Sequence, residues 1–274
     1  MSSKKCSNAQ CKQVKIMLWF TTSHKVTEQL EAEAIRLADC YKGQYAPRGD
    51  LSVAGWLGKR QTDGAFILTN NGLRYSSKEG QPLFFHPNMA YVRLQRVVRG
   101  GHDPLLKAVQ AESGDHIVDC TAGFAADAIM LAHAVGPRGS VTALESAREM
   151  YILVKEGLRS YTSDWPELQE AMSRIQLQHA DYAQWLRSRP DDSCDMIYFD
   201  PMFEQPVEAS ASISPLRALA NPAPLDLSSV QEACRVARKR VVLKDRKGSG
   251  AFDRLGFSLT GTSSNQVAYG VITL

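Results

Sequence analysis

The second part of the chain alternates short apolar runs with amphipathic segments of helical periodicity. The runs that predict β-strands cover residues 116–121, 140–145, 174–179, 194–200 and 240–244. The segments that predict α-helices cover residues 125–135, 147–161, 182–187 and 227–237. Because parallel strands need a crossover connection, usually a helix, this order predicts an α/β fold with a mainly parallel sheet and helices on both faces. The closing runs 256–261 and 266–274 have no helix between them and predict an antiparallel C-terminal hairpin.

The first third of the chain is less regular and predicts a smaller α+β region. Residues 14–21 predict a strand, and Ser23 or Thr27 can cap a helix that reaches about Tyr41. The apolar stripe of that helix consists of Val26, Leu30, Ala34 and Leu37.

Two further elements are expected before the α/β pattern begins. Runs 65–69 and 73–76 flank Asn70-Asn71-Gly72, which predicts a β-hairpin. A helix over residues 88–98 would carry Arg93, Arg96 and Arg99 on one face. We therefore divide the chain into an N-terminal accessory region (1–105) and an α/β domain (106–274).

Composition excludes several classes of protein. The 274 residues are 44% hydrophobic and contain no apolar run of the roughly 20 residues that a membrane helix needs. The six cysteines lack a C-x2-C pair, which favours reduced thiols in a cytoplasmic protein over a disulfide scaffold. The six histidines show no metal-binding spacing, so we expect no metal, and the oligomeric state stays open.

Charge is divided unevenly along the chain. Residues 1–105 hold 15 Lys/Arg against 8 Asp/Glu, whereas residues 106–274 hold 17 against 21. A basic first third favours contact with a polyanion, although the same charges can simply form a solvated surface.

Three carboxylates follow successive predicted strands. Asp119 begins a turn of small residues, Thr121-Ala122-Gly123, that leads to Asp127 at the start of a helix. Glu145 ends the second strand, where a carboxylate can accept hydrogen bonds from ribose hydroxyls, and Asp181 follows the third, within reach of an adenine amino group. The turn has one glycine and therefore lacks the dinucleotide fingerprint; alternatively, its small residues only make the strand-to-helix turn.

A second motif, Asp200-Pro201-Met202-Phe203, ends the fourth strand. The Asp200 carboxylate and the rigid Pro201 carbonyl can accept hydrogen bonds from an amino group, and Phe203 can stack on a planar base. These residues suit methylation of an exocyclic or amide nitrogen, although an Asp-Pro turn beside a core Phe is also a common structural feature.

Together, these motifs resemble the class I S-adenosylmethionine (SAM)-dependent methyltransferases, and more closely the RsmJ-type family, which methylates the exocyclic N2 of a guanine in small-subunit ribosomal RNA. The likeness covers residues 85–244 and includes the run Val241-Val242-Leu243-Lys244. It implies a Rossmann-like sheet, SAM as cofactor with S-adenosylhomocysteine as product, and RNA, from small-subunit rRNA or a ribosomal particle, as partner.

The resemblance also implies roles for individual residues. Those that would bind the cofactor are Asp119, Thr121, Ala122, Gly123, Ala126 and Asp127 on the methionine side, Glu145 and Ser146 at the ribose, and Ala180 and Asp181 at the adenine. Those that would carry catalysis are Asp200, Pro201 and Phe203. Those that would contact substrate are Met202, Lys244, Arg93 and Arg96.

The chain departs from the family pattern at Ala125-Ala126, where members usually carry Gly-Arg, and at Glu204, where they carry Pro. Alanine allows the turn if its φ is negative. After the motif, the Pro-rich stretch 204–225 predicts a substrate lid.

Basic residues surround the fifth predicted strand and could follow RNA phosphates together with Arg93, Arg96, Arg99, Lys59 and Arg60. They are Arg235, Arg238, Lys239, Arg240, Lys244, Arg246 and Lys247, and we expect them close to the active edge. The target base must be unpaired or flipped to enter the site.

Two other functions are compatible with these motifs, and a third is less so. The acceptor can be a protein or DNA nitrogen instead of RNA. The chain can also be a non-catalytic nucleic-acid-binding module with a degenerate cofactor pocket. A nicotinamide dehydrogenase is disfavoured by the single glycine.

Overall fold

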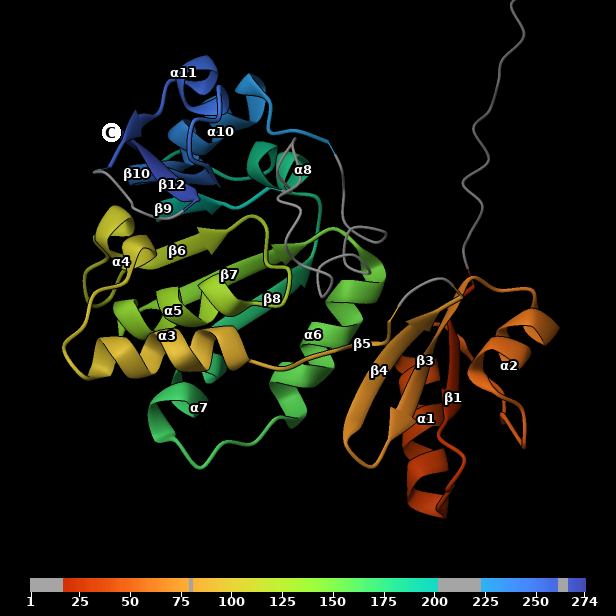
Figure 1. Ribbon diagram of the computed structural model, residues 1–274. Helices are drawn as coiled ribbons and strands as arrows, with labels where there is room; N and C mark the ends of the chain where they lie inside the picture. The colour runs from red at the N-terminus through yellow and green to blue at the C-terminus, as the bar shows by residue number, and fades with distance from the viewer. Residues whose placement is uncertain (1–16, 79–80, 202–222, 261–265) are drawn as a thin grey trace, which may run out of the picture.

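The computed structural model describes residues 17–78, 81–201, 223–260 and 266–274, which form two β-sheets joined through helices (Figure 1). The smaller sheet has the strand order β2-β1-β3-β4-β5, and the larger has the order β11-β12-β10-β9-β6-β7-β8. The predicted α/β fold with a smaller N-terminal α+β region is therefore confirmed.

The smaller sheet is built from the first third of the chain. Its strands are β1 (Trp19–Thr22), β2 (Gln44–Tyr45), β3 (Gly64–Thr69), β4 (Gly72–Ser77) and β5 (Leu83–Phe84). β1 pairs in parallel with β2 and β3, whereas β3, β4 and β5 pair antiparallel. The predicted hairpin at Asn70-Asn71-Gly72 is confirmed, and the part of the predicted 14–21 strand before residue 17 lies outside the described residues.

Helices α1 (Glu28–Cys40) and α2 (Val53–Arg60) accompany this sheet. Thr27 caps α1 by accepting a hydrogen bond from the Leu30 amide at 3.2 Å. Ala34 and Leu37 are buried as predicted. The prediction for Val26 was wrong: it precedes the cap and is 48% exposed.

The larger sheet contains β6 (His116–Asp119), β7 (Ser140–Glu145), β8 (Ile175–His179), β9 (Cys194–Phe199), β10 (Ala237–Arg246), β11 (Ser258–Leu259) and β12 (Val267–Thr273). Five neighbouring strands of this sheet run parallel to one another, in the order β10, β9, β6, β7 and β8. Strand β12 runs antiparallel to both β10 and β11. The closing hairpin is thereby confirmed. The carboxyl ends of β6 to β9 consequently meet at one edge, the carboxyl edge.

Helices cover both faces of the larger sheet (Figure 1). They are α3 (Asn88–Val98), α4 (Pro104–Val109), α5 (Ala126–Val135), α6 (Arg148–Ser160), α7 (Pro166–Ser173), α8 (Tyr182–Arg187), α10 (Leu227–Val236) and α11 (Ala251–Leu255). Val141 and Ala143 pack with the buried faces of α3 to α7, whereas Val118 and Leu144 pack with those of α8, α10 and α11. Among the described residues, no helix is long and apolar enough to cross a membrane.

Helix α6 joins the two sheets. It packs against β7 and β8 of the larger sheet and against β4 and β5 of the smaller one. The Tyr41 hydroxyl donates to Glu156 at 2.5 Å, and Arg148 donates to the Tyr41 carbonyl at 2.5 Å. The apolar core is continuous across this junction, because Phe20 and Phe66 belong to the same buried cluster as Leu153.

The closest approach at this junction requires a glycine. A Cβ added at Gly157 on α6 would lie 2.2 Å from Cβ of Phe85. We expect Gly157→Ala to destabilise the protein by about 2 kcal/mol, since the segment after β5 must move away from the helix. Chemical denaturation checks this. Gly58→Ala, at a helical site where no atom lies within 4 Å of the new Cβ, is the control and should stabilise by about 1 kcal/mol. Equal effects of the two substitutions would contradict the close packing.

Candidate active site

Four carboxylates lie where the parallel strands end. Asp119 is the last residue of β6, Glu145 is the last residue of β7, Asp181 comes two residues after β8, and Asp200 directly follows β9. In the sheet β9, β6, β7 and β8 are consecutive neighbours, so the topology brings these residues to the same carboxyl edge. This edge is where ligands bind in open α/β sheets.

Asp119 is fully buried and only half satisfied. Its Oδ1 accepts the Thr121 amide at 3.0 Å, whereas Oδ2 has no hydrogen-bond partner among the described residues. Burial raises the pKa of Asp119 to about 8, and the nearby Asp127 and Asp200 carboxylates add to the effect. A buried carboxyl oxygen without a partner is costly, so this atom marks a place for a ligand donor or cation.

Glu145 ties the second strand to the first turn. One carboxylate oxygen accepts the Ala147 amide at 2.8 Å, and the other accepts the Gly123 amide at 3.1 Å. Burial raises the pKa of Glu145 despite these bonds. Each oxygen keeps a second lone pair, so the carboxylate can still accept from two hydroxyl groups.

The turn between β6 and α5 uses two residues in the left-handed region. Gly123 has φ of 49° and Ala125 has φ of 60°. The condition of a negative φ, under which alanine suits this turn, is not met at Ala125. Its amide donates to the Ala122 carbonyl at 2.7 Å, and the turn holds the alanine where L-residues lose about 1 kcal/mol. Ala126 is then the first residue of α5.

The predicted adenine side is placed beside this turn. Asp181 caps α8 by accepting the Gln184 amide at 3.0 Å, and the Ala180 amide donates to the Glu145 carbonyl at 3.0 Å. The Ser146 carbonyl bonds to the His179 ring at 3.1 Å. Strands β7 and β8 are thus joined at their ends around Glu145.

Asp127 is the centre of a buried ionic network. Its Oδ1 pairs with Arg93, and its Oδ2 accepts the Tyr198 hydroxyl at 2.7 Å and the Lys244 ammonium at 2.9 Å. Lys244 also donates to Asp200 Oδ2 at 2.7 Å. Lys244 therefore bridges the predicted cofactor turn and the predicted catalytic turn.

Charge complementarity decides the protonation states in this network. Although burial opposes ionisation, Lys244 and Arg93 hold the pKa of Asp127 below its usual range. The pKa of Lys244 is raised by Asp200 and Asp127. Burial raises the pKa of Asp200 to about 6, with Lys244 acting against that rise. The ion pair with Lys244 therefore favours the carboxylate form of Asp200, against the effect of burial.

The backbone around Asp200 is positioned separately from its carboxylate. The Asp200 amide donates to Thr121 Oγ at 2.6 Å, which connects the turn after β9 to the turn after β6. Pro201 follows in the described part of the chain. Met202, Phe203 and the predicted lid up to residue 222 lie outside the described residues.

Arg93 differs in surroundings from Arg96. Besides Asp127, the guanidinium of Arg93 binds both oxygens of Asp103 at 2.9 Å, and only 16% of its side chain is exposed. Arg96 is exposed on the same helix. Arg93 is therefore engaged by carboxylates, and we propose that it positions Asp127, in place of the substrate contact expected from the sequence.

The basic cluster around β10 is divided between two edges of the sheet. Arg235 pairs with Asp191 and Glu232, Arg238 with Asp195, and Lys239 with Glu112 and Asp115. These cations lie at the amino end of β10, opposite the carboxyl edge, whereas Lys244 lies toward its carboxyl end. The expectation that the whole cluster lies close to the active edge was wrong.

Sequence reasoning missed two residues of the network. Tyr198 could have been found from its spacing, because it lies on β9 two residues before Asp200, and residues two apart in an extended chain share one face. Asp103 carried the signal of a helix cap before Pro104, and it accepts the amide of Leu105 at 3.1 Å. Its second role, the pair with Arg93, had no local signal.

Comparison with known proteins relates this architecture to methyltransferases. Residues 62–255 match the family model described as "Putative SAM-dependent methyltransferase". A Bacillus subtilis protein, YpiP, which is described as uncharacterized, is 38% identical over 92% of this chain and 98% of its own length.

More distant relatives carry a specific name. The ribosomal RNA small subunit methyltransferases J of Laribacter hongkongensis and Hydrogenovibrio crunogenus are 33% and 32% identical over 59% and 61% of this chain. The matches span 56% and 58% of those proteins. The crystal structure of a SAM-dependent methyltransferase from Neisseria gonorrhoeae superposes with a TM-score of 0.63 at 18% identity and covers 93% of this chain and 95% of that one.

Proposed function

Because this chain belongs to the SAM-dependent methyltransferase family, we propose that its carboxyl edge transfers the methyl group of SAM to the exocyclic N2 of a guanine in RNA, with small-subunit ribosomal RNA as the substrate. The observation that carries the acceptor chemistry is Asp200: its carboxylate accepts the Lys244 ammonium at 2.7 Å and is followed by Pro201. The relatives named as ribosomal RNA methyltransferases support the choice of RNA.

The residues of the carboxyl edge fit SAM. We propose that Asp119, through the Oδ2 atom that has no partner among the described residues, and the backbone of Gly123 face its methionine part. We propose further that Glu145 and Ser146 hold its ribose, and that Ala180 and Asp181 meet its adenine. Gly123 has no side chain that would narrow the turn on the side proposed for the methionine part. A cation next to Asp119 would lower the raised pKa of that buried carboxyl, which suits the positively charged methionine end.

SAM supplies an electrophilic methyl group bound to a positively charged sulfur. The Asp200 carboxylate and the Pro201 carbonyl accept the N–H groups of the guanine amine and orient its nitrogen toward that methyl. With SAM bound, formation of the N–C bond would accompany cleavage of the bond between the methyl carbon and sulfur, whose electron pair would stay on sulfur and leave S-adenosylhomocysteine. The carboxylate of Asp200 would stabilise the positive charge that develops on the nitrogen and accept the proton that leaves. Lys244 keeps Asp200 ionised before the transfer.

We also propose that the basic N-terminal region, residues 1–105 in our division, recognises the RNA. Its excess of cations supports this assignment. Helix α3 of that region packs against α5, so substrate bound there would lie against the catalytic domain.

Transfer of labelled methyl groups from SAM tests the proposal. The full chain is incubated with small-subunit ribosomal RNA, and the product is digested to nucleosides. We expect label in N2-methylguanosine. Label found only in protein, in DNA or in another nucleoside would overturn the proposed acceptor, and absence of saturable S-adenosylhomocysteine binding would favour the non-catalytic module.

A further inference from the structure

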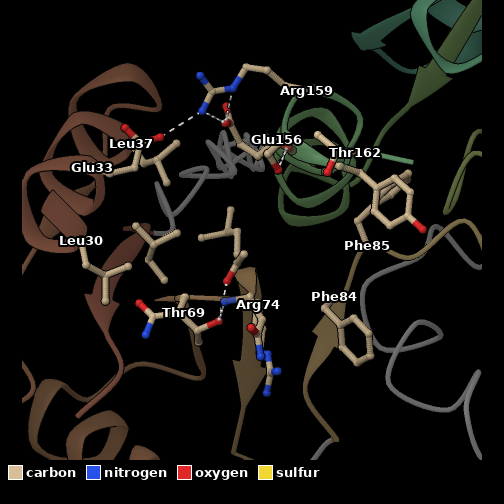
Figure 2. A pocket seen from close by; sticks show the side chains of 18 of the residues that line it. Leu30, Glu33, Leu37, Thr69, Arg74, Phe84, Phe85, Glu156, Arg159 and Thr162 are labelled. Carbon is tan, nitrogen blue, oxygen red and sulfur yellow. Dashed lines mark hydrogen bonds and ion pairs between the residues drawn. The ribbon is translucent and has the colours of Figure 1, made fainter. Parts of the chain in front are cut away.

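A cavity lies away from the carboxyl edge. It measures about 830 Å³ and is lined by α1, the β3–β4 turn, the segment 84–86 and the end of α6 (Figure 2). Helix α6 begins at Arg148, near Glu145, and ends at Ser160. Its 13 residues span about 20 Å, and the cavity contacts only its last turns and the residues that follow. The cavity is therefore distinct from the proposed cofactor site.

The two sides of this cavity differ in charge. On one side Arg159 is neutralised by Glu33 at 3.0 Å and Glu156 at 2.7 Å. On the other side, Arg74 lies with its guanidinium carbon 5.6 Å from the ring centre of Phe84, and no carboxylate within the described ranges forms a salt bridge with it (Figure 2). An anion entering the cavity is thus attracted more strongly to Arg74 than to Arg159, whose charge is offset by the two glutamates.

Phe84 is an aromatic side chain that stays half-exposed beside Arg74. It is 50% exposed, although it directly precedes the buried Phe85. Exposed aromatic rings beside arginine are the stacking platforms of proteins that bind single-stranded nucleic acids.

Polar and apolar groups complete the cavity. Its apolar lining comes from Leu30, Leu37, Leu68 and Leu73, and the amides of Asn70 and Asn71 stand at the hairpin turn. A planar ring, a cation that forms no salt bridge within the described part of the chain, and amide groups together match a nucleotide: they can contact its base, its phosphate and its base edge, respectively. The volume lies in the range of small-molecule sites.

We propose that this cavity binds an unpaired nucleotide of the RNA substrate, remote from the methylated guanine, with its base on Phe84 and its phosphate at Arg74. The proposal rests on the proposed function, because it takes the ligand from RNA. It gives the basic N-terminal region a defined contact and explains why an aromatic side chain stays exposed there. A free nucleotide offers the same chemistry, and the experiment separates the two sources.

The test measures binding of a short, unpaired, fluorescein-labelled RNA oligonucleotide to the full chain and its variants. Loss of a base stack weakens binding by roughly tenfold, so we expect Phe84→Ala to raise the Kd by that factor and Phe84→Trp to restore it. Arg74→Gln should weaken binding. It should also lower the slope of log Kd against log salt concentration by about one, the value for one phosphate contact. Arg187→Gln, which removes an exposed cation from α8, should leave the Kd unchanged.

A second readout separates this inference from the proposed function. Binding of S-adenosylhomocysteine should be equal in all these variants, because none of the substituted residues lies at the carboxyl edge. If Phe84→Ala and Arg74→Gln bind RNA like the wild type while methyl transfer to RNA occurs, the cavity proposal is wrong and the proposed function stands. If guanosine monophosphate binds as tightly as the oligonucleotide and competes with it, the cavity is a free-nucleotide site and its assignment to RNA is overturned.

Discussion

Asp200→Asn is expected to lower the rate of methyl transfer by at least about 100-fold, the usual effect of removing one charge-stabilising group from an active site. The amide has one oxygen, and Lys244 already donates to the carboxylate at 2.7 Å. The variant therefore cannot satisfy the lysine, accept from the guanine amine and take up its proton. Single-turnover transfer of labelled methyl groups measures the rate.

The fold and the cofactor site should tolerate this substitution. The Asp200 amide, not its side chain, makes the bond to Thr121 that positions the turn. Binding of S-adenosylhomocysteine by calorimetry should therefore stay near the wild-type value. Asp63→Asn, at a carboxylate whose side chain is fully exposed, is the matched control and should keep full activity. Retention of full activity by Asp200→Asn would refute the proposed role of its carboxylate.

Lys244→Met should affect both stability and the pH profile. Removing one partner of a buried ion pair costs about 3 kcal/mol here, at the lower end of the usual range, because Arg93 still compensates Asp127. In the wild type the rate should rise with pH through about 6 and level off, since Asp200 acts as the deprotonated carboxylate. Without the ammonium group the pKa of Asp200 rises further, so the midpoint of the profile should move above 6.

Urea denaturation and the pH dependence of single-turnover rates measure these two effects. Lys155→Met, on the exposed face of α6, is the control and should change stability by less than about 0.5 kcal/mol. An unchanged midpoint in Lys244→Met would mean that Lys244 does not control the ionisation of Asp200.

The network around Asp127 explains how the two halves of the site are kept together. Arg93 connects Asp127 to Asp103, the cap of α4, while Lys244 connects it to Asp200. Helices α3 and α4 are thereby fixed to the carboxyl edge by ion pairs as well as by packing.

The larger sheet could be predicted from sequence because each of its elements carries a local signal. Apolar runs near 116, 140, 194 and 240 are separated by helical segments, and a parallel sheet with helices on both faces follows from that order. The same argument places Asp119, Glu145, Asp181 and Asp200 at one edge, since the carboxyl ends of parallel strands meet there. Short elements such as β2 and α11 offered too few residues for a periodic pattern to emerge.

Only the tertiary structure decided which charges meet. The sequence presents Arg93 and Arg238 alike, as cations near other cations, but Arg93 lies among buried carboxylates and Arg238 lies at the opposite edge of the sheet. It also decided that Ala125 adopts a positive φ, and that β5 and α6 enclose a cavity with Phe84 exposed beside Arg74. Periodicity and strand order follow from neighbours along the chain, whereas ion pairs and cavities depend on side chains brought together from distant segments.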